Sequence, residues 1–167
     1  MARKDTGKNF ENEIRRSLKS SRHIWWFRIQ DTNDINRFVK IAIAEKQPAD
    51  FFTVYRGRPI MVEAKTSRNL TSFPLHYGNT RAIAPHQMKA GERLVRAGGV
   101  SLILIRREEY RNKKCYAITP SQAKYLYSKA FKKRSVKWGW FDEHAYKVER
   151  LKAPLRWNLQ KLYEEVI

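Results

Sequence analysis

Apolar residues recur along the chain at two periods, and each period predicts a type of element. Phe10, Ile14 and Leu18 repeat every four residues, which predicts an amphipathic helix over about 7–20. Further helices are expected over 86–97, 120–131 and 155–166. The helix over 86–97 has Pro85 before it and Gly98-Gly99 after it, which are typical start and stop signals. Short apolar runs predict strands at 24–29, 50–55, 60–65, 100–106 and 114–119.

The order of these elements predicts a small mixed sheet. A strand at 60–65, a helix and a strand at 100–106 should form a right-handed parallel crossover. The segment 66–84 is rich in Ser, Thr and Asn and reads as a linker. Residues 30–48 are polar at both ends with an apolar middle, which fits a projecting hairpin, a mobile loop or a short helix. We therefore expect one α/β domain over 1–167, with a mixed central β-sheet flanked by helices.

The charge of the chain points to its partner. Against 16 Asp and Glu there are 35 Lys and Arg, a net charge of +19 spread along a sequence that is 42% hydrophobic. A folded domain with this surface is expected to bind nucleic acid, the alternative being a ribosome-like or membrane-surface basic protein. A single cysteine, Cys115, excludes a disulfide or a cysteine zinc site within one chain. Without an apolar leader or membrane-length run, a cytoplasmic, intracellular protein with no membrane partner is expected.

The stretch "PADFFTVYRGRPIMVEAK" carries acids in what should be a hairpin. A type II′ turn at Gly57-Arg58 would pair Asp50 with Lys65 and place both on one face with Glu63. Two carboxylates at this distance repel, which favours a bound cation, and oxygen ligands suit Mg²⁺ or Mn²⁺. Lys65 could neutralise charge on a phosphate, so phosphodiester hydrolysis is indicated. The alternative is an Asp–Lys cross-strand pair beside a solvated Glu63.

Several motifs resemble known nucleases. Pro48 and Asp50, followed by Glu63-Ala64-Lys65, resemble the PD-(D/E)xK superfamily, with one alanine inserted between Pro and Asp. "GKNFENEIRRSL" is similar to the Gly-x-x-x-Glu start of Holliday junction resolvases. "YRGRPIMVEAKTSRNLTSFPL" and "HQMKAGERLVRAGGVSLILIR" resemble the RecU-type resolvases more closely. A phage-encoded or archaeal-type resolvase with these signatures is the alternative.

The resemblance implies a restriction-endonuclease-like nuclease fold and a Mg²⁺-dependent endodeoxyribonuclease, with Mn²⁺ as a substitute. Such an enzyme would cut four-way DNA junctions symmetrically as a homodimer. It also implies metal binding by Glu11, Asp50 and Glu63, with Lys65 and Gln87 as further catalytic residues. The alternatives are a PD-(D/E)xK restriction or repair endonuclease acting on duplex DNA, and a DNA-binding module without catalysis.

The DNA contacts that the resemblance implies fall in two places. A stalk at about 30–47 would present Arg37, Phe38 and Lys40 to the junction centre. Near the site, phosphate contacts are expected from Arg68, His76, Arg81, His86 and Lys89, the alternative for each being a solvated or capping residue. A basic extension at about 132–167 completes the chain.

Three questions stay open at this level. Glu13 competes with Glu11 as the helix acid, because they lie at opposite edges of the apolar stripe and only the family spacing favours Glu11. Asp31 and Asp34 could contribute a ligand, but the Asp and Asn residues of "DTND" are typical of a turn, which is favoured. The tryptophans and phenylalanine of the first strand are expected in the core. Packing is also favoured over nucleic-acid contact for the aromatic residues near the C-terminus, which are Trp138, Trp140 and Trp157.

Overall fold

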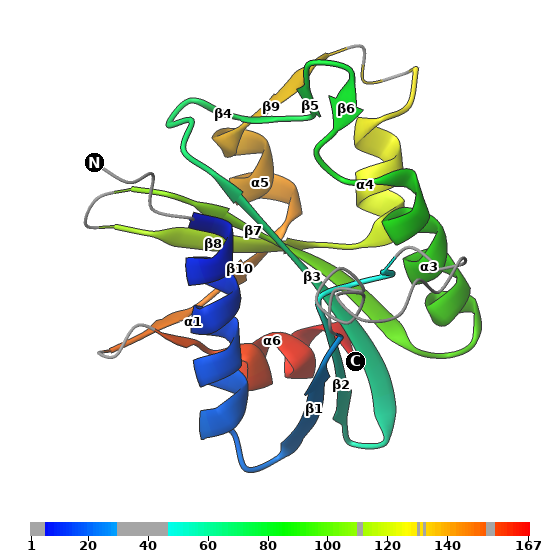
Figure 1. The fold of residues 1–167 in the computed structure, drawn as a ribbon, viewed down its shortest axis with the longest axis vertical. Helices are drawn as coiled ribbons and strands as arrows, with labels where there is room; N and C mark the ends of the chain where they lie inside the picture. The colour runs from blue at the N-terminus through cyan, green and yellow to red at the C-terminus, as the bar shows by residue number, and fades with distance from the viewer. Residues whose placement is uncertain (1–5, 30–46, 110–111, 130, 132, 153–155) are drawn as a thin grey trace, which may run out of the picture.

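The chain folds around a six-stranded mixed sheet. The computed structural model describes residues 6–29, 47–109, 112–129, 131, 133–152 and 156–167. The strand order is β1-β2-β3-β7-β8-β10, and only the β3–β7 pair is parallel. The strands are β1 Ile24–Arg28, β2 Phe51–Tyr55, β3 Arg58–Ser67, β7 Val100–Arg107, β8 Lys114–Ile118 and β10 Tyr146–Val148. The predicted mixed α/β sheet is confirmed (Figure 1).

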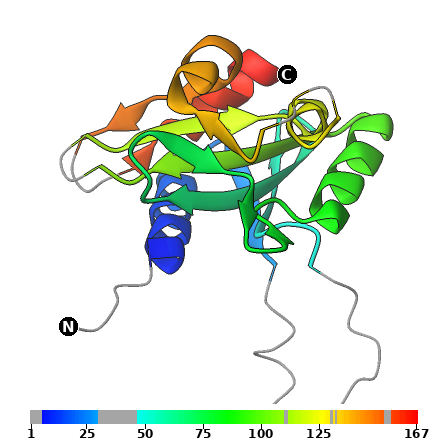
Figure 2. The same ribbon diagram turned by 90° about the horizontal axis from the view of Figure 1, so that it is seen from above.

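Helices cover both faces of this sheet and create two cores. Helices α1 (Thr6–Ser20) and α6 (Leu159–Val166) pack on one face, where the predicted stripe of Phe10, Ile14 and Leu18 is fully buried. Helices α3 (Pro85–Arg96), α4 (Pro120–Leu126) and α5 (Trp138–His144) belong to the core on the other face. Figure 2 shows α1 and α5 on opposite sides of the sheet.

The predicted crossover is present as β3–α3–β7. Strand β3 pairs with β7 in parallel from Ile60 with Val100 to Ser67 with Arg107. Helix α3 ends where the glycine pair predicts, because Gly98 has a φ of +89° and a Cβ on Gly99 would lie 2.6 Å from Leu94. The crossover places the middle of β3 beside the N-terminal end of α3.

The β2–β3 register differs from the prediction by two residues. The turn is Arg56-Gly57, with φ values of 47° and 76°, and Tyr55 pairs with Arg58 instead of Ile60. Positive φ at both central residues is the type I′ arrangement, which, like the predicted type II′ turn, matches the twist of the two strands. Because side chains alternate with a period of two, this shift leaves every residue on its predicted face.

The segment 66–84 is not a plain linker. It contains the short strands β4 (Ser72–Pro74), β5 (His76–Tyr77) and β6 (Thr80–Arg81). Strand β4 pairs with β9 (Ser135–Lys137), and the side chains of Phe73 and Leu75 are buried in the second core. The apolar side chains of this polar segment therefore anchor it to the second core.

The C-terminal third is more divided than predicted. Helix α4 ends at Leu126, five residues before the expected end, and α6 begins only at Leu159. Between them lie β9, α5, β10 and a small ribbon of β11 (Arg150–Leu151) and β12 (Arg156–Trp157). Trp138 and Trp157 are buried, and Trp140 is half-buried and packs against the second core, so packing is confirmed for all three.

The prediction that the aromatic residues of β1 belong to the core is wrong for two of the three. Trp25 is 62% exposed and Phe27 is 51% exposed, whereas Trp26 packs against the core. Trp25 and Phe27 share the face of β1 opposite to that of Ile24 and Trp26, and at this edge of the sheet the described elements leave that face largely uncovered. The segment 30–46, with Asp31 and Asp34 and the expected stalk, lies outside the described residues. In the described part, no helix is long and apolar enough to cross a membrane.

Candidate active site

The predicted acid pair comes together at the centre of the molecule. Asp50 directly precedes β2, and the register from Phe51 with Val62 places it opposite Glu63. One carboxylate oxygen of Asp50 accepts a hydrogen bond of 2.7 Å from the backbone N–H of Ala64. Glu63 is only 5% exposed. The two acids therefore sit side by side where water screens their charges poorly.

Lys65 and Gln87 both contact the same oxygen of Glu63. The ammonium nitrogen of Lys65 lies 2.7 Å from Oε1, and the amide nitrogen of Gln87 donates to Oε1 at 2.6 Å. The amide oxygen of Gln87 accepts from the backbone N–H of Ala84 at 3.0 Å, half of a capping box at the start of α3. This second bond fixes the direction of the amide, so the donor end points at Glu63. The family resemblance implied a place for Gln87 in the site, and the structure puts its side chain on Glu63.

Both acids have raised pKa values. Burial, and then repulsion from Glu63, raises the pKa of Asp50 to about 6, against the opposing effects of the Ala64 hydrogen bond, Lys65 and Arg28. Burial also raises the pKa of Glu63, while Lys65 and Gln87 act to lower it. Two carboxylates that resist ionisation together make a site that gains from a nearby cation.

The structure separates Glu11 from Glu13. Glu11 forms an ion pair of 2.5 Å with Arg28, and its charge is close enough to raise the pKa of Glu63. Glu13 is 4% exposed and lies 2.6 Å from the guanidinium of Arg106, which is fully buried. Glu13 also accepts from the indole N–H of Trp157 at 3.2 Å. Glu13 thus belongs to a buried structural network, and Glu11 faces the acid pair.

Sequence reasoning missed Arg28. Its guanidinium reaches Glu11, and its charge also acts to lower the pKa of Asp50. The available signal was a basic residue closing an apolar strand that ends next to the hairpin. Because β1 and β2 are antiparallel, Arg28 pairs with Phe51, the neighbour of Asp50.

The side chains around the acids suit a divalent cation. Glu63 Oε2 is shielded from solvent and has no hydrogen-bond partner among the described residues. The donors nearby are carboxylate oxygens, which Mg²⁺ and Mn²⁺ prefer. Within the described ranges, no three His, Cys, Asp or Glu residues form a ready-made metal cluster. The chain therefore offers two assembled acids, with Glu11 held beside them by Arg28.

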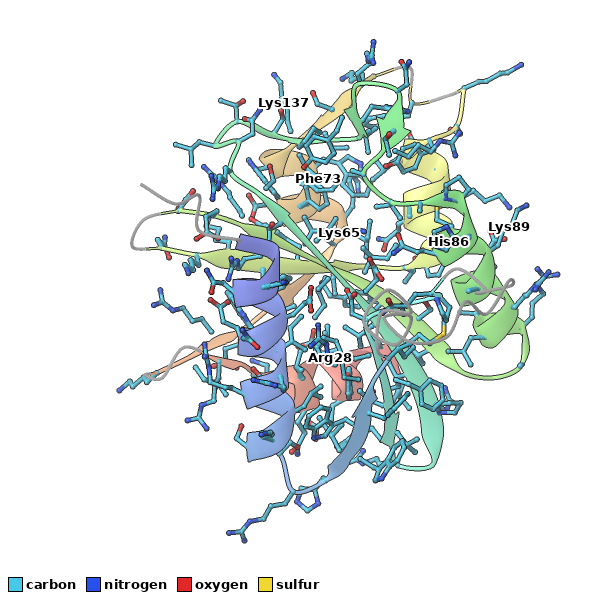
Figure 3. All side chains as sticks on the ribbon, viewed as in Figure 1. Arg28, Lys65, Phe73, His86, Lys89 and Lys137 are labelled. Carbon is cyan, nitrogen blue, oxygen red and sulfur yellow. The ribbon has the colours of Figure 1, made fainter. Side chains whose placement is uncertain are left out.

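The expected DNA contacts divide into three groups. Arg68 and Lys89 are exposed, and His86 is half-buried at the start of α3. Figure 3 shows Lys65 near the centre of the view, with His86 and Lys89 on α3 to one side of it. His76 and Arg81 lie on the β5–β6 hairpin. The stalk residues, namely Arg37, Phe38 and Lys40, lie outside the described residues.

Comparison with known proteins identifies similar sequences. The family model described as "Recombination protein U", RecU, matches residues 6–162. A "Holliday junction resolvase RecU" of Shouchella clausii (strain KSM-K16) is 42% identical over 57 residues, which are 34% of this chain and 25% of that protein. The match thus spans about a quarter of the relative's length. A solved structure of "Hjc, a Holliday junction resolvase" of Archaeoglobus fulgidus is 10% identical, with a TM-score of 0.48. It covers 83% of this chain and 91% of that one, a likeness too weak to add to the argument.

Proposed function

This chain belongs to the RecU family of recombination proteins, and from that premise we propose that it is a metal-dependent DNA endonuclease that resolves four-way junctions. One observation carries the proposal. A buried glutamate, Glu63, shares one oxygen with Lys65 and Gln87, keeps the other without a partner in the described part, and lies opposite Asp50. A structural ion pair would have no need of the second acid, whose pKa is raised by burial and by repulsion from Glu63.

Mg²⁺ is the cofactor in this proposal, with Mn²⁺ as a substitute. Asp50 and Glu63 would hold the ion, the latter through the oxygen that lacks a partner. Glu11 would be the third acid once its carboxylate turns from Arg28. Mg²⁺ commonly binds through one or two carboxylates together with phosphate and water, so two assembled acids are sufficient to begin with. The bound ion would polarise the phosphate, lower the pKa of the attacking water and stabilise the leaving oxygen.

The other site residues have separate tasks. Lys65 lies on the face of β3 that carries Glu63, so its ammonium can hold a phosphate oxygen and offset the charge that develops there. Gln87 keeps the Glu63 carboxylate in one orientation through a bond fixed from the start of α3. Arg28 supplies a second positive charge beside the acids while no substrate is present. Water would then attack the phosphorus in line and the P–O3′ bond would break, so that the leaving 3′-oxygen takes up a proton and the products carry a 5′-phosphate and a 3′-hydroxyl.

The substrate is a four-way DNA junction in this proposal. The net charge of +19 favours a polyanion, and Arg68 and Lys89 are exposed, with His86 half-buried. Two copies related by a two-fold axis would place one site on each of two symmetric strands. The junction specificity and the homodimer both rest on family membership.

A cleavage assay tests the function. Labelled four-way junction and linear duplex of the same sequence are incubated with the protein, with Mg²⁺ and with EDTA. We expect paired cuts in the junction, with Mg²⁺ only. Asp50→Asn should bind the junction and leave it intact. Equal cutting of both substrates would instead indicate a duplex endonuclease, and binding without any cutting would indicate a DNA-binding module.

A further inference from the structure

The β5–β6 hairpin is a small element that lies, along the chain, between the strand and the helix that carry site residues. It runs from His76, which pairs with Arg81, through a tip at which Gly78 has a φ of +61°. It lies in the chain between β3, which carries Lys65, and α3, which carries Gln87. In Figure 2 it projects from the sheet on the side of the view where α1 lies. The hairpin and α1 therefore lie on the same side of the sheet.

The base of the hairpin is firmly held. The hydroxyl of Tyr127 donates to the carbonyl of Leu75 at 2.9 Å and accepts from the backbone N–H of Ile83 at 3.0 Å. Leu75 and Ile83 are fully buried. The backbone carbonyl of Leu75 also accepts a hydrogen bond from the N–H of Ala82, and the N–H of Leu75 donates to the carbonyl of Arg134. The hairpin thus needs little ordering when it binds, which favours affinity.

The outer part of the hairpin is cationic and aromatic. The guanidinium of Arg81 lies 4.9 Å from the centre of the Tyr127 ring, and Arg134 donates to the carbonyl of Gly78 at 3.2 Å. Both arginines are exposed, and neither pairs with a carboxylate among the described residues. Tyr77 at the tip is 56% exposed. Stacking leaves the edge donors of a guanidinium available for the oxygens of a phosphate.

His76 has a different place in this element. Its ring packs edge-on against Tyr127, with the ring centres 5.6 Å apart, and its Nδ1 is shielded from solvent. It therefore helps to fix the ring on which Arg81 stacks. The surface that remains for a ligand consists of Tyr77, Arg81 and Arg134.

We propose that this hairpin binds the double-helical arm of the DNA next to the strand that is cut. Arg81 and Arg134 contact its phosphates, and Tyr77 lies against the sugar and base edge in the groove. This inference rests on the proposed function for its ligand, DNA. A phosphate backbone matches two unpaired guanidinium groups on a protein of charge +19 better than an acidic protein surface does, because its charges are regularly spaced.

Binding measured without cleavage tests the hairpin alone. The dissociation constant for a labelled four-way junction and for a linear duplex is determined in EDTA over a range of salt. The variants are Arg81→Ala/Arg134→Ala and Tyr77→Ala. The control is Arg58→Ala/Arg96→Ala, which removes two exposed arginines at the β2–β3 turn and at the end of α3. Circular dichroism and thermal melting verify that each variant is folded.

The expected results are specific. The hairpin double variant should bind about tenfold or more weakly. The slope of log binding constant against log salt concentration should become shallower by about 2, roughly 0.9 for each lost phosphate contact. Tyr77→Ala should weaken binding several-fold and leave the slope unchanged. Because an arm is present in both DNAs, junction and duplex should lose affinity by the same factor. The control should change affinity by less than about threefold.

Three outcomes would overturn the inference. They are a loss no larger than that of the control, an unchanged salt slope in the double variant, or a loss confined to the junction, which would place the hairpin at the junction centre. The proposed function is judged separately by the cutting of the wild-type protein in Mg²⁺. A wild type that binds and never cuts, with hairpin variants that bind weakly, would remove the function and leave the hairpin inference in place.

Discussion

At the scale of single residues, the site consists of two acids, a buried Glu63 and a half-buried Asp50, whose charges Lys65 partly offsets. Asp50 and Glu63 were predicted to lie on one face of the hairpin. Because side chains alternate with a period of two, the register error of two residues leaves both on that face. Arg28 and the exposed Trp25 depend on which elements lie beside β1, and a periodic pattern contains no such information. The choice between Glu11 and Glu13 likewise needed the position of Arg106, about ninety residues further along.

Asp50→Asn should stabilise the metal-free protein at pH 7. The folded pKa of Asp50 is about 6, above its ordinary value of 3.8. Between these values the folded state holds a proton that the unfolded state has released, so stability falls as pH rises through about 4 to 6. Removing the charge should raise the free energy of unfolding at pH 7 by on the order of 2 kcal/mol, allowing for partial exposure.

Urea melts of both proteins in EDTA at pH 4 and at pH 7 test this. The difference in the free energy of unfolding between Asp50→Asn and the wild type should be present at pH 7 and nearly absent at pH 4. Added Mg²⁺ serves as the control, because it should stabilise the wild type and leave the variant unchanged. A wild type that is the more stable protein at pH 7 in EDTA would show that Asp50 is not a strained charge.

Glu11→Gln and Glu13→Gln should affect different properties, the former the cleavage rate and the latter the stability of the fold. Glu13 is buried against Arg106, and losing its charge should cost about 3–5 kcal/mol of stability, as for other broken buried pairs. Glu11 is paired with a half-exposed Arg28, so its loss should cost about 1 kcal/mol or less. Glu11→Gln should instead slow junction cleavage by about 10–100-fold, as a disturbed metal site usually does.

Thermal melting and single-turnover cleavage separate the two variants. Cleavage by Glu13→Gln is measured at a temperature where it is fully folded, and its rate should then approach that of the wild type. If Glu13→Gln slows cleavage while folded, and Glu11→Gln does not, the two assignments are reversed.

At the scale of elements, the predictable parts were those with a long apolar stripe and clear ends. Helices α1 and α3 were placed within about one residue, because a buried stripe marks α1 and a proline start with a glycine stop marks α3. Strands β4 and β9 were missed, since three residues carry no measurable period and the two partners lie at 72–74 and 135–137. Such strands form because tertiary packing of Phe73 and Val136 holds them together.

Arg56→Asn should stabilise the β2–β3 turn. Arg56 is the only non-glycine residue with positive φ in the described part, and Asn-Gly is the pair that type I′ turns prefer. We expect a gain of about 0.5–1 kcal/mol in the free energy of unfolding. The exposed contact with Glu164, at 3.9 Å, contributes little.

Denaturant unfolding measures the gain, with Glu164→Gln as a control for the lost ion pair. The turn lies outside the site, so cleavage should not change. A loss of stability larger than that of Glu164→Gln would show that Arg56 contributes through its stacking on Tyr55, 5.2 Å from the ring centre.

At the scale of the whole molecule, the crossover β3–α3–β7 joins the fold to the site. Glu63 and Lys65 come from the strand and Gln87 from the helix, so forming the parallel pair assembles three of the site residues at once. The order of strand, helix and strand was enough to predict this. The layers around it were not predictable in detail, because the C-terminal third folds as short elements that pack on both cores.

Paired cutting is a property of two chains, so it makes the homodimer testable through its products. A supercoiled plasmid with an extruded four-way junction becomes linear when both symmetric strands are cut, and becomes a nicked circle when one is cut. Wild type and Asp50→Asn are mixed in equal amounts and allowed to exchange subunits. Only about a quarter of random dimers would then have two active sites.

The yield of linear plasmid in a single turnover should therefore fall to about a quarter, and nicked circles should accumulate. Wild type diluted with buffer is the control, and it should lower the total yield without favouring nicked circles. Light scattering of the free protein gives the mass independently and should show two chains. A monomer mass at the assay concentration, together with linear plasmid in proportion to the wild type present, would mean that each chain cuts alone.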